Sequence, residues 1–123
     1  MATITNHHYV LAVPDARRTA EFFVNQLAFE LRPVNDKDWR FVSKDGFMAM
    51  LGSCPDAIHP TRLGDHSYFA YFVVDDVDAY FNDVRAKGVQ TLNSPSDKPW
   101  GMREFGLQTP DGHRIMVGQK TGN

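Results

Sequence analysis

The chain has 123 residues, of which 42% are hydrophobic and 23% are charged, and its formal net charge is −2. This size fits one domain with a real hydrophobic core, and the scattered Lys and Arg residues argue against nucleic acid or an anionic membrane as a partner. No apolar run is long enough for a membrane span, and Cys54 is the single cysteine. We therefore expect no intrachain disulfide and, by default, a cytoplasmic location.

The segment from 8 to 27 reads as a strand followed by a helix. HYVLAV (8–13) alternates between two faces, as a strand with two different sides does. Asp15 follows at a position suited to cap a helix N-terminus, and apolar residues then recur at helical spacing, namely Ala16, Ala20, Phe23 and Leu27. WRFVSKDGFMAML (39–51) completes this half as a strand, an Asp-Gly turn and a second strand.

The second half repeats the same plan. FAYFVV (69–74) predicts a strand, Asp75–Asp76 an acidic cap, and the next residues a helix that ends near Gly88, a suitable C′ residue. The apolar stripe of this helix consists of Val77, Tyr80, Phe81 and Val84. REFGLQTPDGHRIMV (103–117) again gives a strand, an Asp-Gly turn and a strand, and aligning the two turns places Met50 on Met116.

The repeat predicts an α+β fold of two tandem β-α-β-β-β modules, which form a curved, mostly antiparallel sheet with a concave ligand cleft. We expect a single domain over 1–123, with module one at 5–52, a linker at 53–66 and module two at 67–120. The linker is rich in Pro, Gly, Ser and Asp, which is typical of a connection rather than a core element.

Taken in order, these motifs resemble the vicinal oxygen chelate superfamily, which includes glyoxalase I, extradiol dioxygenases, fosfomycin-resistance enzymes and bleomycin-resistance proteins. The resemblance covers nearly the whole chain and is carried by AEFF (20–23), LAF (27–29), VDDVDAYF (74–81), WGMREF (100–105) and TPDGHRI (109–115). One departure is Ala28, where the family usually has Gly. If that position is left-handed, Ala costs about 1 kcal/mol relative to Gly.

The resemblance implies where a metal would lie. In metal-dependent members, His, Gln or Glu on the first and last strands of each half hold a divalent ion. The corresponding positions, seven residues before each capping Asp and five after each turn Asp, are His8, Phe69, Met50 and Met116. One imidazole, one phenyl ring and two thioethers do not suit Ni²⁺, Mn²⁺, Mg²⁺ or Fe²⁺, which need nitrogen or anionic oxygen donors. We therefore expect no metal and no other cofactor.

The same positions predict a ligand-binding face. Alternation places Tyr71 on the face of Phe69, and Glu104 on the face opposite to Phe105 and Leu107. Glu104 is the one acid that we expect on this face, as a general base or a cation-binding group, and the alternative is a solvated carboxylate at a strand end. The predicted ligand-binding set is His8, Trp39, Met50, Phe69, Tyr71, Trp100, Glu104 and Met116.

Several of these residues also fit a purely structural role. His8 suits a hydrogen-bonded structural residue as well as a catalytic one, and the methionines suit packing as well as an adaptable binding surface. Trp39 and Trp100, which are expected to precede corresponding strands, suit edge packing as well as a pocket rim. The sequence does not decide whether Arg40 and Arg103 face the cleft.

Three functions fit these features. The first is a metal-free protein that sequesters an aromatic or cationic small molecule, in the manner of bleomycin-resistance proteins and as a homodimer. The second is a lyase, isomerase or dioxygenase of the glyoxalase I type, with His8 and Glu104 as candidate catalytic residues. The third is a domain that serves a larger assembly. We favour binding, because three of the four expected ligand positions lack a useful donor.

Overall fold

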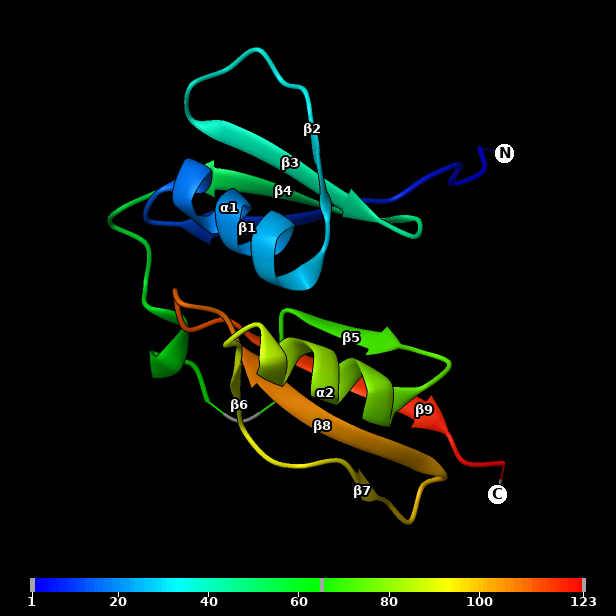
Figure 1. Ribbon diagram of the computed structural model, residues 1–123. Coiled ribbons are helices and arrows are strands. Elements are labelled where there is room, and N and C mark those ends of the chain that lie inside the picture. Colours follow the sequence, from blue (N-terminus) through cyan, green and yellow to red (C-terminus); the bar gives the residue numbers. More distant parts are fainter. Residues whose placement is uncertain (1, 65, 123) are drawn as a thin grey trace. The chain divides into compact units, whose positions relative to one another are not determined.

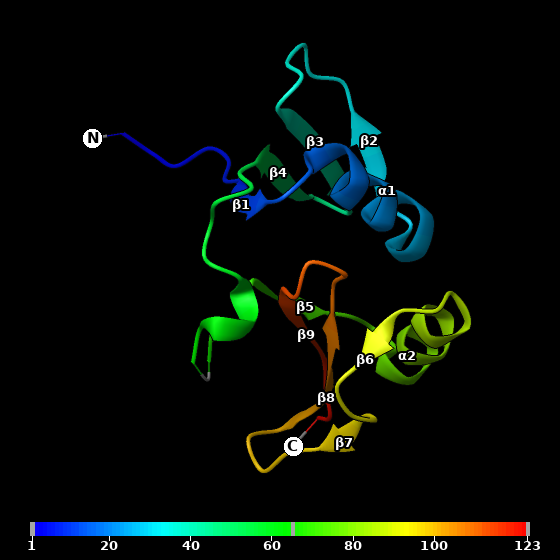
Figure 2. The same ribbon diagram turned by 90° about the vertical axis from the view of Figure 1, so that its left-hand side faces the viewer.

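The chain divides into two units, Met1–Ala57 and Ile58–Asn123 (Figure 1). The computed structural model describes residues 2–64 and 66–122. Within those residues, each unit holds one α-helix and one mixed sheet (Figures 1 and 2). The division falls inside the segment 53–66 that the sequence predicts to be a linker.

In the first unit, one helix packs against a four-stranded sheet. Its elements are β1 (Tyr9–Val13), α1 (Ala16–Leu27), β2 (Glu30–Arg32), β3 (Trp39–Lys44) and β4 (Phe47–Ser53). The strand order is β1-β4-β3-β2, in which β1 is parallel to β4 and the other neighbours are antiparallel. Most pairings are therefore antiparallel, as predicted.

The second unit has the same plan with additions. Its elements are the short 3₁₀ helix Pro60–Arg62, β5 (Ala70–Val73), α2 (Val77–Ala86), β6 (Gln90–Thr91), β7 (Ser96–Asp97), β8 (Met102–Gln108) and β9 (Arg114–Lys120). The strand order is β5-β9-β8-β6, with β7 paired to β8 beside this path. Here β5 is parallel to β9, and β8 is antiparallel to each of its neighbours.

The strand register confirms the predicted tandem repeat and the α+β class. In each unit the first strand lies parallel to the last, and the last pairs with the long strand that precedes it. Val10 pairs with Met50 in the first unit, and Tyr71 pairs with Met116 in the second. The two methionines therefore occupy equivalent positions, as the alignment of the Asp-Gly turns predicts.

Both helices begin at the predicted aspartates. The Asp15 carboxylate accepts hydrogen bonds from the backbone N–H groups of Arg17 and Arg18, at 3.1 and 3.4 Å. The Asp76 carboxylate accepts one from the backbone N–H of Ala79 at 3.0 Å. Each cap satisfies donors that have no partner within the helix, which stabilises the fold by about 1 kcal/mol.

A left-handed residue closes each helix, at the C-cap of α1 and one residue beyond the C-cap of α2. Ala28 has φ 63° and ψ 31°, and the N–H of Phe29 donates to the Phe23 carbonyl at 3.0 Å. In the second unit the corresponding residue is Gly88, with φ 80°. Glycine adopts this conformation without strain, whereas alanine costs about 1 kcal/mol more. The departure noted at Ala28 is therefore a real source of strain.

Each helix buries its predicted apolar stripe against one face of its sheet. Ala16, Ala20, Phe23 and Leu27 are at most 4% exposed. In the second unit Val77 and Val84 are buried, and the rings of Tyr80 and Phe81 lie 6.4 and 5.1 Å from the ring of Phe105. Each fully buried large side chain contributes about 1.5–3 kcal/mol, so these two interfaces account for much of the stability of the units.

The two Asp-Gly turns differ in length. Asp45 and Gly46, with φ 51° and 85°, form a two-residue turn between β3 and β4. The second Asp-Gly lies in a longer connection, closed by a 2.8 Å hydrogen bond from the Thr109 N–H to the His113 carbonyl. No helix in the described part of the chain is long and apolar enough to cross a membrane.

Candidate functional site

The helix covers one face of each sheet, and the predicted site residues on the strands lie on the opposite face, which we call the distal face. In β1, Leu11 and Val13 are buried while Val10 and Ala12 are exposed. In β8, Phe105 and Leu107 are fully buried on the helix side. Strand alternation and pairing then place Met50 on the distal face of the first unit. On the second unit they place Tyr71, Glu104, Gly106, Met116 and Gly118 there.

Glu104 is the polar centre of the distal face of the second unit. It is 6% exposed, and its Oε2 accepts a 2.5 Å hydrogen bond from the hydroxyl of Tyr71. The indole Nε1–H of Trp100 donates to the same oxygen at 3.4 Å. Glu104 is therefore not a solvated strand-end carboxylate, which was the alternative left open by the sequence.

A glycine makes room for Tyr71 beside this carboxylate. Gly118 pairs with Glu104 across β8 and β9. A Cβ atom on Gly118 would overlap with the hydroxyl oxygen of Tyr71 and would lie 2.8 Å from its Cζ. Only glycine leaves the space that the phenol needs to pass over this position and reach Glu104.

The environment of Tyr71 keeps its hydroxyl protonated. Partial burial raises the pKa of Tyr71 well above its usual value of 10.0, and the hydrogen bond to Glu104 and the charge of that carboxylate raise it further. Tyr71 therefore acts as a hydrogen-bond donor at neutral pH and not as a base. The carboxylate of Glu104 is the acceptor of the pair.

The distal face of the first unit has an aromatic ring over a glycine as well. Trp39 pairs with Gly52 across β3 and β4. A Cβ on Gly52 would lie 3.0–3.3 Å from three atoms of the Trp39 indole. Val10 is 63% exposed beside the half-buried Met50. Most of this face is apolar, and its charged side chains come from the edge strand β2, where Glu30 and Arg32 form an ion pair at 3.7 Å.

The two tryptophans do not occupy corresponding positions. Trp39 is the first residue of β3 and pairs with Gly52, whereas Gly118, the counterpart of Gly52, pairs with Glu104. Trp100 lies in the connection before β8 and is 65% exposed. The counterpart of Trp39 is therefore Glu104, so the repeat carries an indole in one unit and a carboxylate in the other.

The four positions at which the resemblance implies a metal do not fit one. His8 is exposed and precedes β1, and Met50, Phe69 and Met116 are half-buried. The ring of Phe69 lies 6.5 Å from that of His113. These residues offer one nitrogen donor, two thioethers and no anionic oxygen, which does not suit a hard or borderline divalent cation. Among residues 2–64 and 66–122, no three His, Cys, Asp or Glu side chains gather into a group that could hold a metal.

His8 and Glu104 lie in different units. His8 lines a depression of about 250 Å³ close to the β3–β4 turn, together with Asn6, Arg32, Ser43, Gly46, Phe47 and Met48. Glu104 is held by Tyr71 and Trp100, both of the second unit.

Arg40 and Arg103, which the sequence left open, both lie on the helix side of their sheets. Arg40 pairs with the fully buried Leu51. Arg103 forms ion pairs with Asp78 of α2 at 3.0 Å and with Asp97 of β7 at 3.2 Å. Arg103 therefore ties α2 to the edge of the second sheet and does not belong to the distal face.

Sequence reasoning placed Gly106 on the ligand-binding face but missed its neighbours Leu92 and Asn93 and the two glycines that lie under aromatic rings. A Cβ on Gly106 would lie 3.0 Å from Leu92 and 3.1 Å from the sulfur of Met116. The N–H of Gly106 donates to the Asn93 side chain at 2.8 Å. The sequence did contain a signal for two of the glycines. Gly52 and Gly118 each follow the repeated methionine by two residues, and a glycine within a strand often marks a place where another group closely approaches the backbone.

Comparison with known proteins agrees with this architecture. A family model described as the Glyoxalase/Bleomycin resistance protein/Dioxygenase superfamily matches residues 5–117. No match is found among curated proteins.

Three solved structures illustrate the likeness. TioX from Micromonospora sp. ML1 is 22% identical, with 94% of this chain and 99% of that chain covered and a TM-score of 0.70. The genomically encoded fosfomycin resistance protein FosX from Listeria monocytogenes is 19% identical, with 98% and 97% covered and a TM-score of 0.74. A glyoxalase/bleomycin resistance protein/dioxygenase from Alicyclobacillus acidocaldarius is 13% identical, with 94% and 90% covered and a TM-score of 0.79.

At sequence identities this low, the solved structures show only that the fold is shared. Membership of the family is shown by the match to the family model. The match to the family model spans both units, including the two helix caps, both Asp-Gly turns and the paired methionines. The chain therefore belongs to the Glyoxalase/Bleomycin resistance protein/Dioxygenase superfamily, that is, the vicinal oxygen chelate superfamily.

Proposed function

We propose that this protein binds and sequesters a small aromatic cation without a metal, at the distal face of the second unit. The observation that carries the proposal is Glu104, a buried carboxylate held between Tyr71 and Trp100 and flanked by Gly106, Met116 and Gly118. A negative charge in such surroundings strongly favours a cationic partner, because the desolvated carboxylate is poorly compensated otherwise.

The hydrogen bonds of Glu104 leave room for a ligand. Within the described residues, both bonds end on Oε2. Oε1 can therefore accept from an ammonium, amidinium or protonated ring nitrogen, and such charge-assisted bonds are about twice as strong as neutral ones.

Exposed apolar side chains around Glu104 favour an aromatic ligand. Trp100 is 65% exposed and Leu92 is 44% exposed. An indole that is fixed at its Nε1–H still presents its ring face, which attracts flat molecules by stacking and cations through its quadrupole. Met116 and Met102 add adaptable apolar contact.

Relatives support a small-molecule ligand of the antibiotic class. The family name includes bleomycin resistance proteins, and the similar protein from Listeria monocytogenes is a fosfomycin resistance protein. A homodimer and a cytoplasmic location remain predictions. The alternative, a lyase, isomerase or dioxygenase that uses His8 and Glu104, has less support because the four metal positions offer one nitrogen donor.

Tryptophan fluorescence tests the proposal directly, because the chain has two tryptophans, Trp39 and Trp100. The Trp39→Phe variant leaves Trp100 as the sole reporter. We expect acridine orange, a planar cation, to quench this variant in a saturable titration. Glu104→Gln, which keeps the size and the acceptor of the side chain, should weaken binding about tenfold or more, in line with the loss of a charged hydrogen bond.

The matched control is Trp100→Phe, which leaves Trp39 as the sole reporter. Quenching that saturates equally in both single-tryptophan variants, or that is unchanged by Glu104→Gln, would place the ligand elsewhere. Fluorescein, a planar anion, should bind much more weakly than acridine orange. Equal affinity for the two dyes would contradict the proposal that the charge of Glu104 selects a cation.

A further inference from the structure

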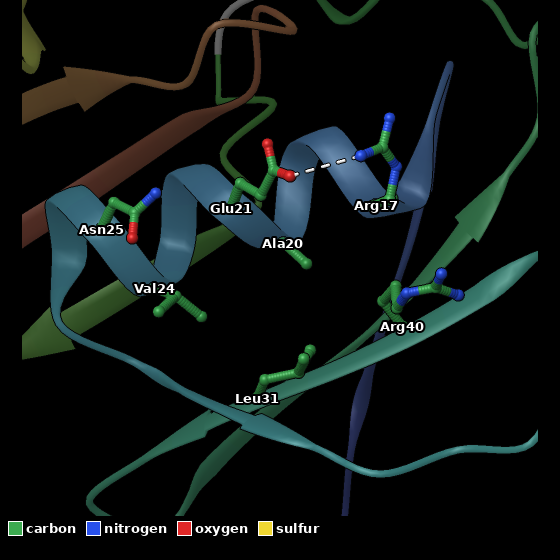
Figure 3. A pocket seen from close by; sticks show the side chains of 7 residues that line it. All are labelled: Arg17, Ala20, Glu21, Val24, Asn25, Leu31 and Arg40. Carbon is green, nitrogen blue, oxygen red and sulfur yellow. Dashed lines mark ion pairs between the residues drawn. The ribbon is translucent and has the colours of Figure 1, made fainter.

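A cavity lies on the helix side of the first sheet, away from the distal face. Its volume is about 330 Å³, and it is bordered by Ala20 and Val24 of α1, Leu31 of β2 and Arg40 of β3 (Figure 3). Arg17 and Glu21 of α1 stand at its rim and form an ion pair at 3.6 Å. This volume is within the usual range of small-molecule pockets.

The internal repeat explains why this cavity exists. Counting from the capping aspartates, Ala20 is the counterpart of Phe81. The strand register makes Arg40 the counterpart of Phe105, since their partners Leu51 and Val117 each precede the repeated glycine. In the second unit the two phenylalanine rings lie 5.1 Å apart and fill the space between helix and sheet. The first unit has a methyl group and an arginine there instead.

The cavity has an apolar wall that the helix does not cover. Leu31 pairs with Val42, so both side chains point to the helix side of the sheet. Val42 is fully buried, but Leu31 is 54% exposed. Together with Ala20 and Val24, Leu31 forms an apolar channel that can receive a hydrocarbon chain.

Arg40 presents an unused hydrogen-bonding edge. Its Nη1 donates to the backbone carbonyl oxygens of Trp39, Asp36 and Lys37, at 2.8, 3.2 and 3.4 Å. These bonds fix the guanidinium. Within residues 2–64 and 66–122, Nε and Nη2 have no protein acceptor. This is the edge on which arginine binds a carboxylate through two parallel hydrogen bonds.

The charges around the cavity favour an anion. Glu21 is the one carboxylate among the lining residues, and its charge is compensated by Arg17. The charge of Arg40 is not compensated in the same way, because its three hydrogen bonds go to neutral carbonyl groups. A half-buried guanidinium of this kind gains from an anionic partner more than an exposed one does.

We propose that this cavity binds a small amphipathic carboxylate, with its carboxylate on Nε and Nη2 of Arg40 and its hydrocarbon chain between Ala20, Val24 and Leu31. The site is separate from the distal face of the second unit and does not depend on the function proposed there. It uses the asymmetry of the repeat, in which one helix–sheet interface is filled and the other is left open.

Calorimetric titration with sodium octanoate tests this proposal. We expect one octanoate per chain, with octanol and acetate each binding at least tenfold more weakly, because each lacks one half of the recognised molecule. Arg40→Gln should weaken octanoate binding at least tenfold, and Arg62→Gln, which removes an exposed arginine of the other unit, should leave it unchanged. Ala20→Phe, which copies the second unit, should abolish binding.

Three outcomes overturn the proposal: no octanoate binding at millimolar concentration, equal binding of octanol and octanoate, or unchanged affinity in Arg40→Gln. Thermal unfolding of each variant shows whether it folds. Arg40→Lys retains the charge but lacks the two-donor edge, so intermediate affinity supports the assigned geometry and wild-type affinity contradicts it. The comparison of octanoate with octanol uses the unmodified protein, so it tests the role of the carboxylate even if a variant fails to fold.

Discussion

At the scale of single residues, the hydroxyl of Tyr71 links β5 to the carboxylate of Glu104 on β8. The bond fixes the orientation of Glu104 and leaves the tyrosine as a donor. Because burial and Glu104 raise the pKa of Tyr71, the unfolded chain loses this proton before the folded protein does. Tyr71 therefore contributes stability that is complete below the ordinary tyrosine pKa and is lost as the pH rises above it.

Urea unfolding at about pH 9 and about pH 11, on either side of the ordinary tyrosine pKa of about 10, measures this contribution. We expect the wild-type protein to lose more free energy of unfolding between these two pH values than Tyr71→Phe does. The phenylalanine variant has no hydroxyl to titrate at this position, so it is the control for the wild-type protein. Identical pH dependence in the two proteins would show that the bond to Glu104 is absent in solution.

Ala28 offers a second prediction for a single residue. Its φ of 63° is strained for alanine, and glycine would relieve the strain while adding some conformational freedom to the unfolded chain. We expect Ala28→Gly to raise the free energy of unfolding by about 0.5–1 kcal/mol, measured by denaturant titration. Ala86→Gly, at the last residue of α2, is the matched control and should not raise the stability, because this position is helical and favours alanine.

At the scale of elements, each sheet depends on a glycine under an aromatic ring. Gly118→Ala would push the Tyr71 ring away from β9 and break its bond to Glu104. We expect a loss of about 1–3 kcal/mol in the free energy of unfolding, as for other overpacked sites, together with weaker ligand binding. Gly64→Ala is the control, since a Cβ there meets nothing within 4 Å. Equal effects of the two substitutions would contradict the assigned packing.

The sequence predicted elements wherever local chemistry decides the structure. The aspartate caps, the helical stripes and the Asp45–Gly46 turn follow from hydrogen bonding, amphipathic spacing and allowed backbone angles. The β-α-β-β-β plan predicted a strand between each helix and the next hairpin, and β2 and β6 fill these places, but no motif located them. The strand β7 was not predicted at all. Gln90–Thr91 and Ser96–Asp97 become strands through pairing with β8 rather than through any pattern of their own.

The candidate site was predicted in part, for a similar reason. Alternation sufficed to place Glu104 and Tyr71 on one face, but it gave no sign that they are bonded to each other. The counterpart relation between Trp39 and Glu104 requires the strand register. The cavity at Arg40 depends on how far α1 reaches over β2, which no local motif indicates.

At the scale of the whole molecule, the two repeats share a plan and differ in chemistry. The second unit keeps a filled helix–sheet interface and carries a buried carboxylate on its distal face. The first unit has a largely apolar distal face, with the Glu30–Arg32 ion pair at its edge, and an open cavity beside Arg40. Repetition supplies two similar scaffolds, and substitutions at equivalent positions give each a different preference, for a cation in one unit and an anion in the other.

The central claim is that a member of this superfamily binds its ligand without a metal. Calorimetric titration with Ni²⁺ and Mn²⁺, on protein purified without chelators and analysed for metal content, tests it most directly. With Met50, Met116 and Phe69 at three of the four implied positions, we predict no stoichiometric metal and no saturable binding. One equivalent of metal bound with micromolar or tighter affinity would contradict the account.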